Sequence, residues 1–418
     1  MKVLLVGSGG REHALAWKLA GSTRGVELHA APGNPGIAAL GECHPVRAED
    51  GEALLGLARS LAADLAVIGP EAPLVGGVAD ELRHAGVAVL GPGRAAARIE
   101  GSKTFAKDVM RAAGVPTGTT LAVARPPCVV KVDGLAAGKG VFVCRTAEEL
   151  DRALGAAAAF EGPLLIEELL EGEEVSLFAL CDGRNALGLV PAQDFKRLGD
   201  GDTGPNTGGM GSYAPVPSLG SDRIDELLEL VHRPVVAELA RRGTPFVGLL
   251  YAGLMLTEAG PKVLEFNCRF GDPETQSILP LLEGDIVSAL AATARGDLTG
   301  VKLSATEGVA AVTVVLAAGD YPARSDHGST IEGLAQAEDT GALLFHAGTA
   351  LHGGRLVTNG GRILDVTATG LSLAEARERA YAACELIAFP GVRYRRDIAS
   401  AAVTATTSRG AGAARPRR

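Results

Sequence analysis

The sequence lacks the features that mark secreted, membrane-spanning and zinc-finger proteins. Its six cysteines lie far apart, with no C-x-x-C pair and no Cys/His set at zinc spacing, so we expect free, buried thiols. No apolar run approaches the ~18–20 residues that a membrane helix needs. The chain opens on a strand-like MKVLLVG rather than a signal peptide. We therefore expect a cytoplasmic protein with no membrane partner.

Basic residues are in the minority. The 49 acidic and 40 basic residues give a net charge of −9, which argues against a nucleic-acid partner but leaves room for a basic pocket around a phosphorylated small molecule. Only nine of the basic residues are lysines, so each lysine is informative. Four of them fall in one stretch, at Lys103, Lys107, Lys131 and Lys139.

Apolar residues and glycine are abundant. Hydrophobic residues make up 47% of the chain and glycine occupies 56 positions, which indicates a folded protein with many tight turns. The length of 418 residues suggests about three domains at roughly 150 residues each. We expect domains over 1–100, 101–304 (with a lid subdomain at about 121–190) and 305–399, then a disordered tail over 400–418 that lacks apolar periodicity.

The first hundred residues alternate between strand and helix patterns. The predicted strands are 3–6, 26–31, 65–68 and 87–90, and the predicted helices are 11–20, 52–62 and 77–85. This alternation predicts a doubly wound parallel α/β domain, whose ligands bind beyond the carboxyl ends of the strands.

The remaining domains have an α+β pattern. In the middle of the chain we expect a hairpin of 129–132 and 141–144, a helix capped by Thr146 and Glu149, and further elements that end in a helix over 223–242 and strands near 253–256 and 262–267. A polar loop over 193–212 lies between them, and loops of that length are usually functional or disordered. The C-terminal part predicts a strand over 309–317, a hairpin around 359–361 and a helix that begins at Ser372.

The segment Gly7-Ser-Gly-Gly-Arg-Glu-His13 follows a predicted strand and precedes a helix. Its backbone N–H groups and the helix dipole favour a phosphate or ribose-phosphate site. A dinucleotide site fits poorly, because Glu12 stands where the third glycine of the fingerprint belongs. A purely structural turn remains an alternative.

A second glycine-rich segment runs from Lys131 to Gly140. It is no Walker A loop, because strands flank it on both sides and Gly140 replaces the required Ser or Thr. A glycine-rich hairpin can instead cover nucleotide phosphates, with Lys131 as a fixed cation and Lys139 as a mobile one. The alternative is a surface turn with solvated lysines.

Two acidic segments complete the pattern. Residues 166–175 are an acidic linker or a nucleotide hinge in which Glu174 binds ribose hydroxyls. In Val263-Leu-Glu-Phe-Asn267, strand alternation places Glu265 and Asn267 on one face and Leu264 and Phe266 on the other. Carboxylate and amide oxygens suit Mg²⁺, and Arg269 continues the same parity toward a phosphoryl oxygen.

Together these motifs resemble the ATP-grasp superfamily. The stretches GSGGREHALAWKLA, APGNPG, GPEAPLV, EGSK, KVDGLAAGKGV, DTGPNTGGMG and EFNCRFGDPETQ resemble, more narrowly, the phosphoribosylamine–glycine ligase (glycinamide ribonucleotide synthetase) family. The likeness runs from residue 1 to about 399.

The resemblance implies an ATP-dependent ligase of de novo purine biosynthesis, a monomer that joins glycine to 5-phosphoribosylamine through glycyl phosphate. It implies Mg²⁺ or Mn²⁺ held by Glu265 and Asn267, and the catalytic residues Lys139, Asp194 and Arg269. The remaining implied contacts are, for ATP, Lys103, Lys131, Gly138, Lys139, Gly140, Glu167, Glu168, Leu170 and Glu174, and, for the substrates, Gly9, Gly10, Arg11, Asn34, Pro35, Gly208 and Gly209.

The chain departs from the family pattern at Phe195, where the family usually has His, and in two shortened stretches after Thr120 and Phe160. Two other hypotheses stay open at this point. One is a different ATP-grasp ligase, such as a carboxylating enzyme of the same pathway. The other is a nucleotide-binding protein without catalysis.

Overall fold

The N-terminal domain is built on a parallel sheet, as the strand–helix alternation predicts. The computed structural model describes residues 1–135 and 139–405. The strand order is β3-β2-β1-β4-β5, and all neighbours are parallel. The elements are β1 (Lys2–Gly7), α1 (Gly10–Ala20), β2 (Glu27–Pro32), α2 (Pro35–Ala38), β3 (Glu42–Cys43), α3 (Gly51–Leu61), β4 (Leu65–Ile68), α4 (Glu71–Gly76), α5 (Val78–His84), β5 (Ala88–Leu90) and α6 (Arg94–Gly101).

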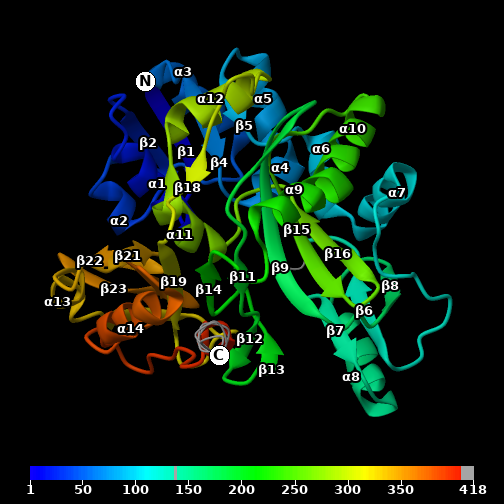
Figure 1. The fold of residues 1–418 in the computed structure, drawn as a ribbon. Helices are drawn as coiled ribbons and strands as arrows, with labels where there is room; N and C mark the ends of the chain where they lie inside the picture. Colours follow the sequence, from blue (N-terminus) through cyan, green and yellow to red (C-terminus); the bar gives the residue numbers. More distant parts are fainter. Residues whose placement is uncertain (136–138, 406–418) are drawn as a thin grey trace, which may run out of the picture.

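The central part contains two antiparallel sheets, and the smaller one forms the lid at one end of the molecule (Figure 1). The lid sheet has the order β7-β6-β8, and Thr146 and Glu149 form the predicted capping box of its helix α8. The larger sheet has the order β10-β9-β15-β16. The elements are α7 (Lys103–Ala113), β6 (Cys128–Val132), β7 (Val141–Cys144), α8 (Ala147–Ala157), β8 (Leu164–Glu168), β9 (Glu173–Asp182), β10 (Ala186–Gly188), β15 (Val247–Thr257) and β16 (Gly260–Asn267).

The predicted helix over 223–242 consists of three pieces. These are α9 (Ser221–Leu227), the π-helical η1 (Leu228–His232) and α10 (Arg233–Arg241). Pro234 lies in the first turn of α10 and has no N–H to continue the ladder, so the break lies where proline is tolerated.

The predicted loop over 193–212 is wrong in part, because it contains strands. β12 (Arg197–Gly199) and β13 (Thr203–Asn206) form a small hairpin. β11 (Gln193–Asp194) and β14 (Gly211–Ala214) join the C-terminal sheet, where β14 pairs with β19 (Ala310–Ala317). This pairing links segments about a hundred residues apart in sequence, which local patterns do not reveal.

The C-terminal part forms two sheets, with the orders β11-β14-β19-β24-β21 and β20-β23-β22. The predicted hairpin around 359–361 is wrong, since β23 and β24 are consecutive but belong to different sheets. The elements are β20 (Asp326–Thr330), α13 (Leu334–Glu338), β21 (Leu343–His346), β22 (Thr349–His352), β23 (Arg355–Gly360), β24 (Arg362–Gly370) and α14 (Leu373–Cys384), which Ser372 caps as predicted.

The start of the predicted disordered tail is helical over 400–405. Val403 packs against the C-terminal core, which explains why this stretch is ordered. The rest of the tail, 406–418, lies outside the described residues.

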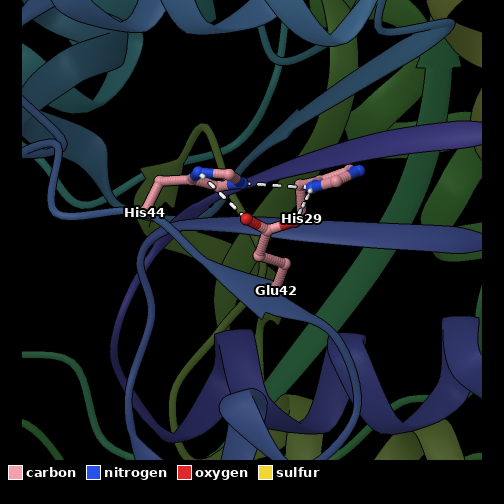
Figure 2. Close-up of side chains that lie close together, drawn as sticks. All are labelled: His29, Glu42 and His44. Carbon is pink, nitrogen blue, oxygen red and sulfur yellow. Dashed lines mark hydrogen bonds and ion pairs between the residues drawn. The ribbon is translucent and has the colours of Figure 1, made fainter.

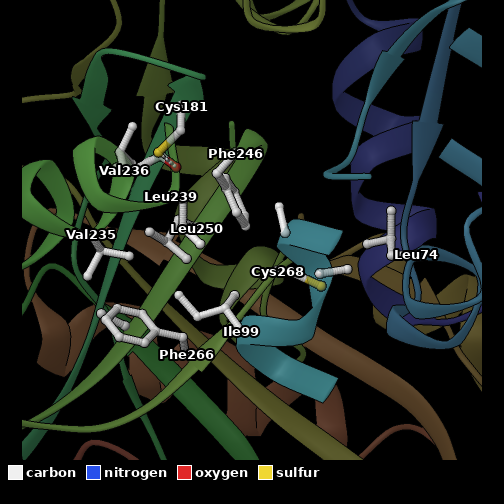
Figure 3. Close-up of a cluster of buried hydrophobic side chains, with 14 of the residues drawn as sticks. Leu74, Ile99, Cys181, Val235, Val236, Leu239, Phe246, Leu250, Phe266 and Cys268 are labelled. Atoms are coloured by element: carbon white, nitrogen blue, oxygen red, sulfur yellow. Dashed lines mark hydrogen bonds between the residues drawn. The ribbon is translucent and has the colours of Figure 1, made fainter. Parts of the chain in front are cut away.

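Between the domains, α11 (Glu274–Ile278), η2 (Leu279–Leu281), β17 (Leu282–Glu283), α12 (Ile286–Arg295) and β18 (Ser304–Ala305) run back toward the N-terminal sheet. A continuous hydrophobic core joins this sheet to the larger central sheet (Figure 3). Ile99 of α6, Phe246 directly before β15, Leu250 of β15 and Phe266 of β16 belong to it and are at most 2% exposed. Because each such side chain contributes roughly 1.5–3 kcal/mol on burial, the core fixes β16 relative to the N-terminal domain.

Within 1–135 and 139–405, every helix is too short or too polar to span a bilayer.

Candidate active site

A bulge in β16 shapes the strand that carries the predicted metal ligands. Glu265 lies opposite Gly253 and Asn267 opposite Tyr251. The register shifts between Glu265 and Val263, because Val263 lies opposite Leu254. Leu264 is therefore unpaired, and Val263 and Phe266 are the buried residues. Glu265 and Asn267 keep their common parity, and Leu264, at the bulge, is half-buried whereas Phe266 is buried.

The bulge links this strand to the lid. Lys131 Nζ of β6 donates to the Leu264 carbonyl at 2.9 Å and forms an ion pair with Glu167 of β8 at 2.8 Å. Lys107 Nζ of α7 pairs with the same carboxylate at 2.7 Å. Burial of these groups is compensated because the charges are mutually satisfied. The lid lysine thus contacts the strand that carries the predicted metal ligands.

Lys103, the first residue of α7, contacts the glycine-rich turn, and Lys139 belongs to that turn. Lys103 Nζ donates to the Gly134 carbonyl at 2.9 Å, and burial lowers its pKa while the Glu265 carboxylate opposes the shift. Lys139 is exposed, and its Nζ donates to the Pro322 carbonyl of the C-terminal domain at 3.3 Å. Gly140 is buried, and its carbonyl accepts from Val132. Gly138 lies outside the described residues.

The predicted nucleotide hinge carries paired carboxylates. Glu168 Oε1 accepts from Lys262 Nζ at 2.7 Å and from the Thr119 N–H at 2.8 Å. Glu174 of β9 forms an ion pair with Lys196. Leu170 is half-buried beside Gly118. Glu168 thus joins the lid to the edge strand β16, and Glu174 lies on β9 of the larger sheet.

Lys196 occupies the centre of a carboxylate cluster. Its ammonium contacts Glu174 and lies 3.4 Å from Glu265 Oε1. Although burial opposes it, Glu174, Asp194 and Glu265 raise the pKa of Lys196 well above its usual range. The ammonium is therefore held in its charged form.

The pKa values of the carboxylates near Lys196 are shifted in different directions. Burial raises the pKa of Asp194 well above its usual range, against the effect of Lys196 and with the help of Glu274. Burial also raises the pKa of Glu274. For Glu265, burial is outweighed by Lys196 and Lys131, which lower its pKa. Glu265 therefore favours the ionised form, whereas Asp194 and Glu274 favour protonation when no further cation is present.

Arg269 is held by two carboxylates of the N-terminal domain. Its Nη2 lies 3.1 Å from Glu100 Oε1, and its Nε lies 3.3 Å from Glu71 Oε2. Although burial opposes it, Arg269 and Arg11 lower the pKa of Glu71 to about 2. Arg269 Nη2 also donates to Asn267 Oδ1 at 3.4 Å. The guanidinium thus lies directly beyond the predicted metal ligands.

A cavity of about 670 Å³ opens where the N-terminal sheet meets the C-terminal domain. It has polar walls, with Lys139 from the lid and Arg324 and Arg362 from the C-terminal domain among them. Asp272 pairs with Arg362 at 2.7 Å and lies only a few residues beyond Arg269. The lining residues are Ser8, Gly9, Pro32, Gly33, Asn34, Lys139, Asp272, Tyr321, Pro322, Ala323, Arg324, Ser325, Ala347, Gly348, Thr349, Asn359, Gly361 and Arg362.

Of the predicted substrate residues, Gly9 and Asn34 line this cavity. The Gly9 N–H already donates to Glu12 Oε2 at 2.6 Å, and the Asn34 amide donates to the carbonyls of Ser8 and His346. These donors are therefore already used, and both residues contribute to the shape of the cavity wall. Pro35 begins α2 behind Asn34.

The other predicted substrate residues do not line the cavity, although several contact residues at or near its wall. Gly10 packs closely against Asp365, and Arg11 pairs with Glu12 at 2.8 Å and donates to the Phe270 carbonyl. Arg362 donates to the carbonyl of Gly208 at 2.8 Å, and the Gly209 carbonyl is 3.5 Å away. The roles of these residues in binding stay predictions.

Sequence reasoning missed three contributors to the site. Lys196 lies in the polar segment over 193–212, and the scarcity of lysine in this chain was a usable signal. Glu274 lies within the EFNCRFGDPETQ stretch that carries the resemblance, but no role was predicted for it. Arg362 carries no local signal, because only the fold brings β24 to the cavity. At Phe195 the ring lies 4.8 Å from the Arg395 guanidinium and packs on the C-terminal core.

Family models cover most of the chain. Residues 1–100 match the N domain of phosphoribosylglycinamide synthetase, 101–275 its ATP-grasp (A) domain, and 311–401 its C domain. The phosphoribosylamine–glycine ligase of Streptomyces coelicolor is 50% identical over 97% of this chain and 100% of its own length. That of Mesorhizobium japonicum is 47% identical over 96% of this chain and 99% of its own length.

Solved structures agree with these matches. The crystal structure of the phosphoribosylamine–glycine ligase from Thermotoga maritima has a TM-score of 0.80 and 37% identity, over 95% of this chain and all of that one. A biotin carboxylase domain from Hydrogenobacter thermophilus shares the fold alone, with a TM-score of 0.68 at 19% identity, over 94% of this chain and 91% of that one. The chain belongs to the phosphoribosylglycinamide synthetase family, a family of ATP-grasp ligases.

Proposed function

We propose that the chain joins glycine to 5-phosphoribosylamine at the expense of ATP, giving glycinamide ribonucleotide, ADP and phosphate in the de novo pathway to IMP. The observation that carries the proposal is the contact between Lys131 of the lid and Leu264 of β16, directly before Glu265 and close in the strand to Asn267. The same strand leads through Arg269 to Asp272 at the cavity. The proposed positions of ATP cleavage and amine attack are therefore neighbours along one stretch of the chain.

The reaction has two steps. A glycine carboxylate oxygen attacks the γ-phosphorus, the bond to the β-phosphate oxygen breaks, and ADP leaves. The amine of phosphoribosylamine then attacks the acyl carbon, the bond to the phosphate oxygen breaks, and the nitrogen loses a proton. An unactivated carboxylate is a poor electrophile, so the mixed anhydride replaces one difficult step by two easier ones.

The residues of β16 fit a hard divalent ion. Glu265 and Asn267 supply oxygen donors, and the Lys196 ammonium contacts both Glu174 and Glu265. A second cation would relieve the burial penalty that raises the pKa of Asp194 and Glu274. Glu265 and Asn267 would hold Mg²⁺ or Mn²⁺, which neutralises charge on the transferred phosphoryl group when bound.

The chain's own side chains bind and orient the reactants. Lys103 and Lys131 face the phosphates of ATP, and Lys139 extends from the glycine-rich turn over the cavity. Gly138, Gly140, Glu167, Glu168, Leu170 and Glu174 complete the proposed nucleotide site.

The substrates lie beyond the nucleotide. Arg269 steadies the acyl phosphate, because its guanidinium is fixed beside Asn267. Asp194 accepts from the glycine ammonium, which would lower its raised pKa. Gly9, Gly10, Arg11, Asn34, Pro35, Gly208 and Gly209 shape the pocket for glycine and the ribose phosphate.

The proposal extends to organisation. The domain boundaries are 1–100, 101–304 and 305–399, with β11 and β14 crossing from the central domain into the C-terminal sheet. The proposed state is a monomer in the cytoplasm that acts on small molecules.

ADP release tests the proposal. We expect release only when glycine and freshly prepared phosphoribosylamine are both present. A stronger response to another amino acid would overturn the substrate assignment. Dependence on bicarbonate would instead indicate a carboxylating ligase, and ATP binding without turnover would indicate a protein that has lost catalysis.

A further inference from the structure

Two histidines and a glutamate meet on the edge of the N-terminal sheet, outside the candidate active site (Figure 2). His29 lies on β2, Glu42 on β3, and His44 directly after β3. Figure 2 shows the two imidazoles and the carboxylate beside one another, with His44 facing His29 through Nε2 and Glu42 through Nδ1. We call these residues the His29–Glu42–His44 cluster.

The strand register fixes this arrangement. His29 is the partner of Glu42 in the parallel ladder, and the His44 N–H donates to the Ala30 carbonyl at 2.8 Å. Residues two apart on a strand share a face, so Glu42 and His44 present their side chains to the same side. Backbone pairing thus places the Cα atoms of His29, Glu42 and His44 close together.

The distances suit a small metal ion. His29 Nδ1 is 3.0 Å from His44 Nε2 and 3.6 Å from Glu42 Oε2. One potential ligand atom from each residue lies within 4.8 Å of the other two. In a tetrahedral site with bonds of about 2.0–2.1 Å, neighbouring ligand atoms lie roughly 3.3–3.4 Å apart. The two separations from His29 lie within a few tenths of an ångström of this value, whereas the Glu42 carboxylate, 4.0 Å from His44 Nδ1, has to move further toward the imidazoles.

A second feature supports metal binding. His29 Nε2, the nitrogen that faces away from the cluster, lies 3.2 Å from Glu27 Oε1. Histidines that bind metals usually donate their other N–H to a carboxylate, which fixes the tautomer and the ring. His29 is 5% exposed, whereas the Glu42 side chain is 67% exposed. The buried ligand is thus oriented, and Glu42 leaves a path from solvent.

We propose that the His29–Glu42–His44 cluster binds one transition-metal ion of the Zn²⁺ type, with water in the remaining position. Two imidazoles and one carboxylate favour Zn²⁺ over Mg²⁺, which prefers oxygen ligands. The ion would tie the two-residue strand β3 to β2, just before Gly33 and Asn34 at the cavity. Binding would therefore stabilise this edge of the sheet without taking part in the ligase reaction.

Titration of the metal-free full-length chain with ZnCl₂ in excess Mg²⁺ tests the proposal. We expect one Zn²⁺ per chain, an increase in Tm, and the absorption bands of tetrahedral Co²⁺ when CoCl₂ replaces zinc. His44→Gln and His29→Gln should each weaken zinc binding at least about 10-fold. The His44 side chain is 16% exposed against 6% for His29, so the His44 variant is the safer one for folding.

Matched variants separate this site from others. His84→Gln removes an exposed histidine, and Cys43→Ser removes the thiol between Glu42 and His44; both should bind zinc as the unaltered chain does. Full-strength binding in a folded His44→Gln variant would overturn the proposal. So would loss of binding in Glu265→Gln or Cys43→Ser, which would place the ion in the active site or on the thiol, and so would the absence of stoichiometric binding.

Discussion

Lys131 Nζ on the lid strand β6 donates to the carbonyl of Leu264, the unpaired residue of the β16 bulge, at 2.9 Å. The bulge is what frees this carbonyl from the ladder between β15 and β16. Because Glu265 follows immediately, the contact holds a lid cation beside the proposed metal ligands. The catalytic account depends on this juxtaposition.

Replacement of Lys131 tests the lid cation. Lys131→Met should lower kcat by about 100- to 1000-fold, because a fixed charge near the transferred phosphoryl group is lost. Glu167 keeps its ion pair with Lys107, so Tm should change little. Lys302→Met, at an exposed lysine far from the cleft, is the control. Steady-state kinetics and thermal unfolding check both expectations, and a near-normal kcat in Lys131→Met would contradict them.

Replacement of Glu265 tests the proposed metal ligand. Glu265→Gln should reduce activity by roughly 100-fold or more and raise the Mg²⁺ concentration needed for half-maximal rate, because one ionised ligand is lost. Glu258→Gln, on the exposed turn between β15 and β16, should leave both unchanged. A rate series over Mg²⁺ concentration measures the effect. An unchanged Mg²⁺ requirement in Glu265→Gln would place the ion elsewhere.

Acid should weaken the contact between the N-terminal and C-terminal domains. His13 Nδ1 accepts from the His346 N–H at 2.7 Å, and burial, followed by the nearby His346, lowers the pKa of His13 to about 3. Below pH 6.5 the unfolded chain gains a proton that the folded chain excludes, so the free energy of unfolding falls as pH decreases from 6.5 toward 3. His13 alone should account for about 2 kcal/mol at pH 5.

Unfolding measured from pH 7 to pH 5 checks this sign. His13→Gln keeps a hydrogen-bond acceptor but cannot titrate, so its stability should fall less steeply with acid. His84→Gln, at an exposed histidine, should keep the original slope. Identical slopes in all three proteins would contradict the assignment.

Phe195 should tolerate the polar residue usual in the family. Its ring packs near the Arg395 guanidinium and Tyr213 rather than on the carboxylates around Lys196. Phe195→His should therefore change the free energy of unfolding by about 1 kcal/mol and kcat by less than about threefold. Kinetics and chemical denaturation measure the two effects. A large gain or loss of kcat would show that position 195 takes part in the reaction.

Local patterns predicted much of this fold. The strands of the N-terminal domain are buried on both faces, and their short apolar runs and capping signals are visible in the sequence. The fold class, the family and the ligase activity expected from the motifs are confirmed by the family matches and the close relatives. The residue roles and domain boundaries stay predictions.

The errors have a common physical origin in pairing between distant segments. The bulge at Leu264 depends on the register with β15, and β14 becomes a strand because β19 lies beside it. The chain after Gly360 passes from one sheet to another, which a turn sequence cannot distinguish from a hairpin. Lys196 is likewise explained only by carboxylates brought from β9 and β16.

A crystal structure with a non-hydrolysable ATP analogue and Mn²⁺ tests the central claim most directly. The account predicts anomalous Mn²⁺ density at Glu265 and Asn267, with the triphosphate between that ion and the ammonium groups of Lys103 and Lys131. Manganese bound away from Glu265 and Asn267, or a triphosphate that contacts neither lysine, would contradict it.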